Sequence, residues 1–211
     1  MASAAAIGSA LFAAVLLTAG PAADPAGPRV VQPGAPGQPG RTLSRDELLS
    51  FSPPAHMRAD SRFMQRMILH HEQALRMTAL VPGRGVGPEV TLLATRIEVS
   101  QRDEIAQIRR WLADHGEEAP SSAAGHAGHG DMPGMLTDGQ LDRLGRARGA
   151  EFDRTFLEFM IHHHEGALTM VRELYATGGG LEPATDRFAR EVNADQSIEI
   201  RRMRSMLADL R

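Results

Sequence analysis

The chain has 211 residues, of which 42% are apolar and 23% charged, the composition of an ordinary soluble globular protein. Its formal net charge of −3 excludes the strongly basic surface with which proteins bind nucleic acid or anionic membranes. The absence of cysteine excludes disulfides, thiolate metal sites and a lipid-anchoring cysteine.

The first 23 residues predict export. An uncharged apolar stretch runs from Ala4 to Ala19, and small residues follow it, which is the pattern of a signal-peptide core with its cleavage region. The stretch is short for a membrane span. Because no Lys or Arg precedes it, an uncleaved N-terminal anchor remains an alternative. Residues 24–42 are rich in proline and glycine, and we expect them to form a disordered linker.

Helical signals dominate residues 43–211, and no segment shows the period-two alternation of a strand. Two short helices are predicted because Ser44–Glu47 and Thr137–Gln140 both have the capping-box pattern. Pro88 stands where a first helical residue would stand, and it opens a long helix. The expected long helices run over about 57–80, 88–115, 150–176 and 183–211.

The two halves of this region repeat. Residues 60–77 (DSRFMQRMILHHEQALRM) and 153–170 (DRTFLEFMIHHHEGALTM) are identical at 10 of 18 positions, and segments 101–112 and 196–207 also match in register. Each half is therefore a helical hairpin, at about 57–114 and 150–211, and a His/Met-rich loop at 115–136 joins them. Neither hairpin can cover its apolar stripe alone. We therefore predict an all-α four-helix bundle, with short extra helices in the N-terminal and middle connections.

Polar side chains fall on the predicted inward faces of all four long helices. When Met67 and Met160 are taken as inward, the helical period of about 100° per residue brings histidines and an aspartate to the same face of each helix. Each partner helix adds a glutamate at the edge of its apolar stripe. Buried polar groups need partners, and a buried carboxylate needs a cation. The candidate residues are His70, His71, His163, His164, Asp60, Asp153, Glu104 and Glu199.

Two interpretations of these groups compete. In the first, Asp60 and Asp153 cap the N-termini of their helices, while the histidines donate hydrogen bonds to Glu104 and Glu199 across the bundle. In the second, imidazole and carboxylate groups from facing helices bind a metal. We favour the metal because the whole set occurs twice in the same order. The aspartates are then further ligands or supports for the ligands.

Adjacent histidines are expected to play different roles, because about 100° separates neighbours on a helix. His71 and His164 point towards the helices that carry the glutamates, and they are the predicted core ligands. His70 and His163 either join that site or hold metal nearer the surface. His162 has no histidine counterpart in the first repeat and is not expected to be a ligand.

The loop between the repeats carries a separate signal. Its sequence GHAGHGDMPGM places His126, His129, Met132 and Met135 within ten residues. A linker has no packing reason for methionine. Thioether and imidazole without thiol suit copper better than magnesium, calcium or manganese, although a Gly/His loop also binds nickel or zinc adventitiously. These four residues are predicted to capture or hand over copper.

The duplicated motif resembles a known family. The pattern D-x-x-F-x-x-x-M-I-x-H-H-x-x-A-L-x-M, read from Asp60 and from Asp153, is similar to the domain of unknown function 305 family, as are the Q-x-x-E-I segments and G-D-M-P-G-M at 130–135. The similarity covers residues 43–211. It implies a ferritin-like four-helix bundle that is usually exported. Some members resemble periplasmic proteins that take up copper through His and Met and help to resist copper stress.

The chain departs from one pattern of ferritin-like bundles. Di-iron carboxylate bundles carry a Glu-x-x-His pair on two helices, and this sequence has none. We therefore predict an exported metal-binding protein that sequesters or delivers copper in the cell envelope, with zinc, iron or manganese as other candidate metals. Two alternatives remain: a dinuclear iron or manganese oxidase or peroxidase, and a structural or interaction bundle without metal. Metal ions are the expected partners. We expect no binding to nucleic acid, and no membrane contact apart from an uncleaved N-terminal anchor. The sequence does not decide whether the chain forms a homodimer.

Overall fold

The computed structural model describes residues 30–32, 39–50, 55–120 and 132–210. The chain divides into two compact units, Met1–Ser52 and Pro53–Arg211. The predicted signal segment at residues 1–23 lies outside the described residues. Among the described residues, no helix is both long and apolar enough to cross a membrane.

Residues 30–32 and 39–50, the described part of the first unit, form one pair of very short strands and one short helix. Strand β1 (Val31–Gln32) pairs antiparallel with β2 (Arg41–Thr42), with Val31 opposite Thr42 and Gln32 opposite Arg41. Two residues per strand are too few to leave an alternating pattern, which is why the sequence predicts no strand here. Helix α1 (Arg45–Leu49) follows β2 directly.

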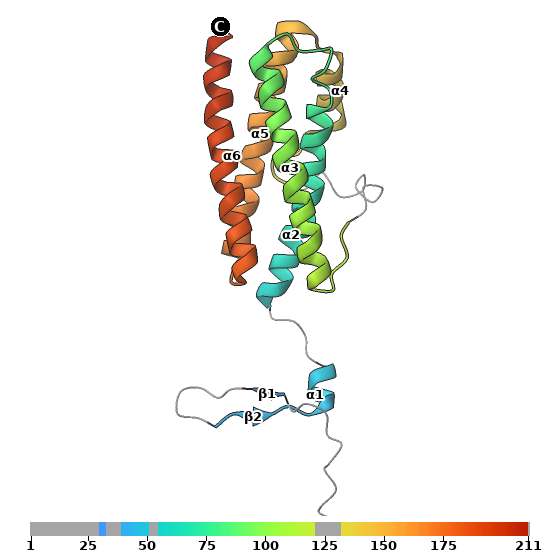
Figure 1. Cartoon of the computed structure of the whole chain (residues 1–211), viewed down its shortest axis with the longest axis vertical. Coiled ribbons are helices and arrows are strands. Elements are labelled where there is room, and N and C mark those ends of the chain that lie inside the picture. Colours follow the sequence, from blue (N-terminus) through green and yellow to red (C-terminus); the bar gives the residue numbers. More distant parts are fainter. Residues whose placement is uncertain (1–29, 33–38, 51–54, 121–131, 211) are drawn as a thin grey trace, which may run out of the picture. The chain divides into compact units, whose positions relative to one another are not determined.

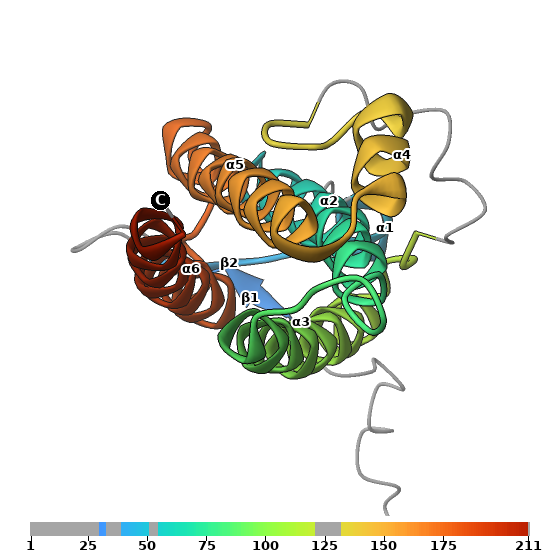
Figure 2. The same cartoon turned by 90° about the horizontal axis from the view of Figure 1, so that it is seen from above.

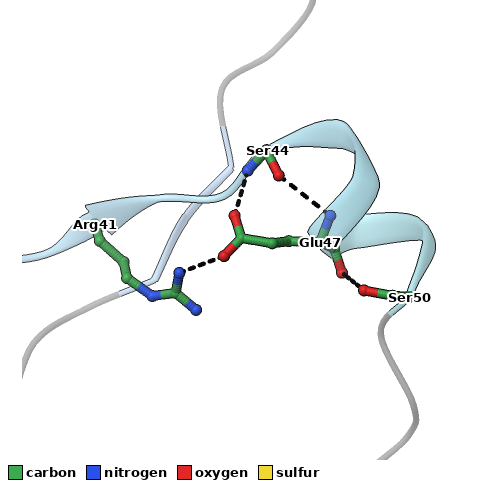
Figure 3. A network of polar contacts seen from close by, with 4 residues as sticks. All are labelled: Arg41, Ser44, Glu47 and Ser50. Carbon is green, nitrogen blue, oxygen red and sulfur yellow. Dashed lines mark hydrogen bonds and ion pairs between the residues drawn. The ribbon is translucent and has the colours of Figure 1, made fainter.

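The predicted capping box is present at the start of α1 (Figure 3). The Glu47 amide donates to the Ser44 hydroxyl at 3.2 Å, and the Ser44 amide donates to the Glu47 carboxylate at 2.8 Å. The Arg41 guanidinium contacts the same carboxylate at 2.5 Å, and the Ser50 hydroxyl donates to the Glu47 carbonyl. The hydrogen bonds from Ser44 and Arg41 bring the pKa of Glu47 down to about 2.

The second unit is the predicted all-α four-helix bundle. Its helices are α2 (Ala55–Thr78), α3 (Pro88–Asp114), α4 (Asp138–Arg146), α5 (Gly149–Ala176) and α6 (Pro183–Asp209). The long helices α2, α3, α5 and α6 lie side by side in Figure 1, and Figure 2 shows them end-on, with α2 between α3 and α5 and with α6 against α5. Two hairpins, α2–α3 and α5–α6, therefore meet through α2 and α5.

The bundle core consists of two apolar clusters. One contains the C-terminal half of α2 and the N-terminal half of α5, and the other contains the opposite halves of the same helices. Each long helix leaves a gap between its contributions to the two clusters. The gaps lie between Ile68 and Ala74, between Ile97 and Ile105, between Met160 and Ala167, and between Val192 and Ile200. Because the gaps occur in all four helices, a polar layer separates two apolar halves of the core.

Two buried aspartates join the hairpins reciprocally. Asp153 on α5 accepts a hydrogen bond of 2.8 Å from the amide of Gly87, in the turn of the first hairpin. Asp60 on α2 accepts one of 2.6 Å from the amide of Gly180, in the turn of the second hairpin. The first interpretation expected Asp153 to cap the N-terminus of its own helix. The N-cap of α5 is Arg148 instead, so this expectation is wrong for Asp153. Each aspartate instead binds the turn of the opposite hairpin.

Candidate metal centre

The polar layer at the middle of the bundle contains all four histidines of the duplicated motif. His70 and His71 on α2 and His163 and His164 on α5 are fully buried, with 0% of their surface exposed. Facing helices contribute polar side chains to the same gaps, because the duplicated hairpins pack with their equivalent positions side by side. Such a layer is costly in an apolar core unless its groups are paired or bind a ligand.

His70 and His163 stack on each other where α2 meets α5. Their ring centroids lie 3.8 Å apart, with an angle of 33° between the rings. Nε2 of His163 lies 3.0 Å from the carbonyl oxygen of His70, and Nε2 of His70 lies 3.1 Å from the carbonyl oxygen of Pro133. A carbonyl oxygen can only accept, so Nε2 carries the proton in both rings. The lone pair of each neutral ring is therefore on Nδ1.

Burial keeps these two imidazoles neutral. It lowers the pKa of His70 and of His163 well below 6.5, and the neighbouring histidines lower both further. The hydrogen bonds to the two carbonyl groups act in the opposite direction and are outweighed. Neutral imidazole is the form that binds metal ions, so both rings are already in the ligating state.

The other two histidines each contact a glutamate of their own hairpin. Nε2 of His71 lies 2.6 Å from Oε2 of Glu104, and Nε2 of His164 lies 2.6 Å from Oε2 of Glu199. The glutamate side chains are 14% and 15% exposed. A carboxylate that accepts from one ring nitrogen is a common partner of a metal-binding histidine, because it fixes the ring and leaves the other nitrogen for the metal.

The four imidazoles share one unusual feature. Within the part of the chain that the structure describes, the Nδ1 atoms of His70, His71, His163 and His164 are buried and have no hydrogen-bond partner. A buried acceptor that remains unsatisfied costs about 1–3 kcal/mol. Neutral nitrogen ligands in a site without its metal would have such unpaired lone pairs. The histidines of this layer therefore fit the role of metal ligands.

Further polar groups of the layer lie on α3 and α6. The amide oxygen of Gln101 and both amide atoms of Gln196 are buried without a hydrogen-bond partner among the described residues. Asp195 lies at the edge of the layer, where burial raises the pKa of its carboxyl group and the nearby Glu104 and Glu199 raise it further. The carboxyl groups of α3 and α6 thus give one side of the layer a negative potential that would attract a cation.

A segment of the middle connection closes the opposite side of the layer. Residues 132–136 cross α5 at Gly166 so closely that a Cβ atom on Gly134 would lie 2.6 Å from the Gly166 Cα atom. Gly134 has a φ of 75°, which favours glycine. On α2, the Gln73 side chain donates to the Leu136 carbonyl at 2.9 Å and accepts from the Leu136 amide at 2.7 Å. These contacts fix the Pro133 carbonyl over His70.

The docked segment contains the two predicted methionine ligands. Met132 is buried, with 7% of its surface exposed, and Met135 is half-buried. Met132 directly precedes Pro133, whose carbonyl oxygen lies 3.1 Å from Nε2 of His70. His126 and His129 lie outside the described residues.

The aspartates of the motif lie far from this layer along the helix axis. Ten residues separate Asp60 from His70, and ten separate Asp153 from His163, which is about 15 Å at 1.5 Å per residue. One oxygen of each aspartate accepts from a hairpin turn, while Oδ1 of Asp153 is buried without a hydrogen-bond partner among the described residues. The structure therefore does not bring the aspartates together with the histidines.

Across the described ranges of the chain, no three His, Asp or Glu side chains converge closely enough to hold a metal ion. A metal in the layer would therefore need histidine nitrogens together with another type of ligand. Met67 and Met160, both fully buried, precede His71 and His164 by four residues, and residues at this spacing are neighbours on a helix. Their thioethers are the nearest candidates by helical position.

Sequence reasoning missed Gln73, Gly166 and Asp195. Gln73 and Gly166 occupy equivalent positions of the two repeats, inside the otherwise matching stretches HHEQAL and HHEGAL. The replacement of a glutamine by a glycine within such a similar stretch indicates that another segment of the chain packs against this face of the bundle. Asp195 has Ser100 as its counterpart, and nothing in the repeat marks it.

Comparisons with known proteins agree with this architecture. A sequence profile described as "Domain of unknown function (DUF305)" matches residues 60–207. No curated protein matches the chain. A DUF305 fragment from Deinococcus radiodurans is 30% identical, with a TM-score of 0.64 over 74% of this chain and 99% of that one. A DUF305 protein from Streptomyces coelicolor, named as a candidate secreted protein, is also 30% identical, with a TM-score of 0.62 over 72% and 93%.

The chain is also similar to CopM, whose structure is known with metal. The Cu(II)-bound form of CopM is 29% identical, with a TM-score of 0.61 over 72% of this chain and 97% of that one. The Cu(I)-bound form is 26% identical, with a TM-score of 0.58 over 71% and 96%.

Proposed function

The chain belongs to the DUF305 family, and on that premise we propose that it is an exported protein that binds copper in the histidine layer of its bundle. The observation that carries this proposal is the set of four buried Nδ1 atoms without hydrogen-bond partners among the described residues. A purely structural network would satisfy these atoms, because unsatisfied buried acceptors destabilise the folded state. Coordination of metal by these nitrogens would satisfy them.

The chemistry of the layer favours copper over harder cations. The available ligands are neutral imidazole nitrogens and neighbouring thioethers, whereas magnesium, calcium and manganese prefer carboxylate and carbonyl oxygens. The similarity to CopM, solved with Cu(I), with Cu(II) and with silver, supports the same class of metal. Zinc and iron would also accept imidazole, and a competition experiment must separate them from copper.

We assign different roles to the residues around the layer. His70, His71, His163 and His164 are the candidate nitrogen ligands, at most two of them for any one ion in the observed arrangement, so that other ligands such as thioethers complete the coordination. Glu199 orients the ring of His164 by accepting a hydrogen bond from Nε2, and Glu104 contacts Nε2 of His71. The aspartates hold the hairpin turns and are not ligands in this proposal.

The middle connection would deliver copper to the layer. Met132 and Met135 lie in the segment that closes one side of it, and His126 and His129 precede them in the sequence. In this proposal these four residues capture copper and pass it to the histidines. Sequestration or delivery fits such an arrangement better than catalysis.

Export is part of the proposal. The apolar N-terminal stretch predicts it, and the similarity to the candidate secreted protein of Streptomyces coelicolor supports it. An oxidising compartment suits a copper protein without cysteine, because Met and His are not lost to disulfide formation.

The test is a competition titration of the purified full chain with Cu(I) against a colorimetric chelator. In the double variant His70→Gln with His163→Gln, the glutamine amide can still donate to the carbonyl oxygens but no Nδ1 atom remains. We expect a loss of affinity of about 100-fold or more relative to the unaltered chain. His162→Gln is the matched control, because His162 is exposed on the same helix. Unchanged affinity in the double variant would contradict the proposal.

A further inference from the structure

His70 takes its hydrogen-bond acceptor from outside the four long helices. Its Nε2 donates to the carbonyl oxygen of Pro133 at 3.1 Å, and Pro133 belongs to the non-helical segment 132–136. The stacked partner His163 differs, because its Nε2 donates at 3.0 Å to the carbonyl oxygen of His70, a backbone group of α2. The acceptor of His163 is therefore fixed by a helix, whereas the acceptor of His70 stays in place only if the segment does.

The acceptor decides which nitrogen of a neutral imidazole can bind metal. A neutral ring carries one proton, and only the other nitrogen offers a lone pair. Donation to Pro133 keeps the proton of His70 on Nε2, so the lone pair is on Nδ1, which is buried without a hydrogen-bond partner among the described residues. Without a carbonyl group at Nε2, no acceptor would favour the proton there. Part of the population would then carry it on Nδ1 and lose that ligand atom.

Gln73 holds the segment in place from α2. Its side-chain amide donates to the Leu136 carbonyl at 2.9 Å and accepts from the Leu136 amide at 2.7 Å, and only 1% of its surface is exposed. Gln73 follows His70 by three residues, as Leu136 follows Pro133. Two neighbouring positions on one helix face therefore bind the segment at two points. The pairing with Leu136 requires a donor and an acceptor on one side chain, which glutamine provides.

The second repeat shows that a helix of this bundle does not require the glutamine. The equivalent position is Gly166, and the segment passes directly over it. A Cβ atom added to Gly134 would lie 2.6 Å from the Gly166 Cα atom, so the segment lies between the glutamine of α2 and a close backbone contact on α5. Both polar atoms of the Gln73 amide bind the segment, so this side chain acts on the segment rather than on the four helices.

We propose that Gln73 is a positioning residue of the copper site, which acts on His70 through the 132–136 segment. It holds the Pro133 carbonyl at Nε2 of His70, and this carbonyl leaves Nδ1 of the same ring available to copper. The inference rests on the proposed function of the histidine layer. Coordination at Nδ1 in turn makes the Nε2–H group a stronger donor, so a loaded ring would hold the segment more firmly.

The position of the ring proton is measured in the metal-free full chain, isotope-labelled at the histidine nitrogens. Long-range proton–nitrogen correlation spectra above pH 6.5, where both buried rings are neutral, show which ring nitrogen carries the proton. The spectrum of His70→Gln identifies the signals of His70. In the unaltered chain we expect its proton on Nε2 alone. In Gln73→Leu, which removes both hydrogen bonds to Leu136, we expect a mixture of two tautomers for His70 and an unchanged Nε2–H form for His163.

Two further variants separate this effect from a general loss of stability. Gln65→Leu is the matched control, because Gln65 also lies on α2 and donates at 2.9 Å to a backbone carbonyl of the same connection, at Glu118 rather than in the segment over His70. It should leave the tautomers of both rings unchanged. Gly134→Ala displaces the segment from the α5 side, and it should shift the tautomer of His70 in the same direction as Gln73→Leu.

Competition titrations with Cu(I) complete the test. Gln73→Leu should bind copper about tenfold more weakly than the unaltered chain, and Gln65→Leu should bind it equally well. A proton on Nε2 of His70 alone in both Gln73→Leu and Gly134→Ala would overturn the proposal, and so would a shifted tautomer without loss of copper affinity. If the unaltered chain did not bind copper, the proposed function would fail. The proton positions, measured without metal, would still decide whether Gln73 acts on His70.

Discussion

Gly166→Ala tests the closure of the histidine layer by the 132–136 segment. Gly166 lies inside α5, and a Cβ atom added there would overlap the backbone of Pro133 and Gly134. Two effects of the substitution have opposite signs. Alanine favours the helix over glycine by about 0.5–1 kcal/mol. Overpacking at a close backbone contact typically costs about 1–3 kcal/mol.

The structure indicates which effect is larger. The segment cannot move away from Gly166 without weakening the hydrogen bond from His70 to Pro133 and the two bonds between Gln73 and Leu136. Each such bond contributes about 1 kcal/mol. We therefore expect Gly166→Ala to lower the free energy of unfolding by about 2 kcal/mol, and the melting temperature by about 6 °C.

Urea and thermal denaturation of the metal-free chain measure this effect. Gly145→Ala is the matched control, because Gly145 is helical and an added Cβ would meet no heavy atom within 4 Å. The control should be neutral or slightly stabilising. If Gly166→Ala were as stable as Gly145→Ala, the reasoning about the docked segment would be refuted.

Three further predictions concern the rest of the bundle. Asp153→Ala removes the acceptor of the Gly87 amide and should lower the free energy of unfolding by about 2 kcal/mol in urea, with Asn at this position recovering part of the loss. Because the pKa of His70 and of His163 lies well below 6.5, the metal-free chain should be most stable above about pH 6.5. Below that pH these two histidines bind protons in the unfolded chain but not in the folded chain, so the free energy of unfolding should fall by about 1.4 kcal/mol per pH unit for each histidine. Urea titrations at several pH values measure this dependence. The plot of unfolding free energy against pH should become flatter when both histidines are replaced by Gln. Glu199→Gln should weaken copper binding about 10–100-fold in competition titrations, and unchanged affinity would exclude an orienting role.

Local signals in the sequence predicted the helices, and the duplication predicted their assembly. Pro88 and the two capping boxes act within one turn of their helices, so the observed bounds agree with the predicted ones to within a few residues. The repeat of an apolar stripe in two hairpins left few arrangements other than a bundle, and the structure confirms it.

The histidine layer was predictable only in part. A helical projection gives the direction of a side chain but not its height along the bundle, so it placed Asp60 on the same inward face as His71 although they lie at different levels. The stacking of His70 on His163 depends on how closely α2 approaches α5, which no local pattern encodes. The docking of residues 132–136 depends on the absence of a side chain at Gly166, and it could have been suspected only from the mismatch with Gln73.

The most direct test of copper binding in the histidine layer is a copper-loaded crystal with anomalous data collected at the copper absorption edge. We expect an anomalous peak between the four long helices, within bonding distance of Nδ1 atoms of the motif histidines. A layer without copper in a crystal that binds copper elsewhere would contradict the proposed site.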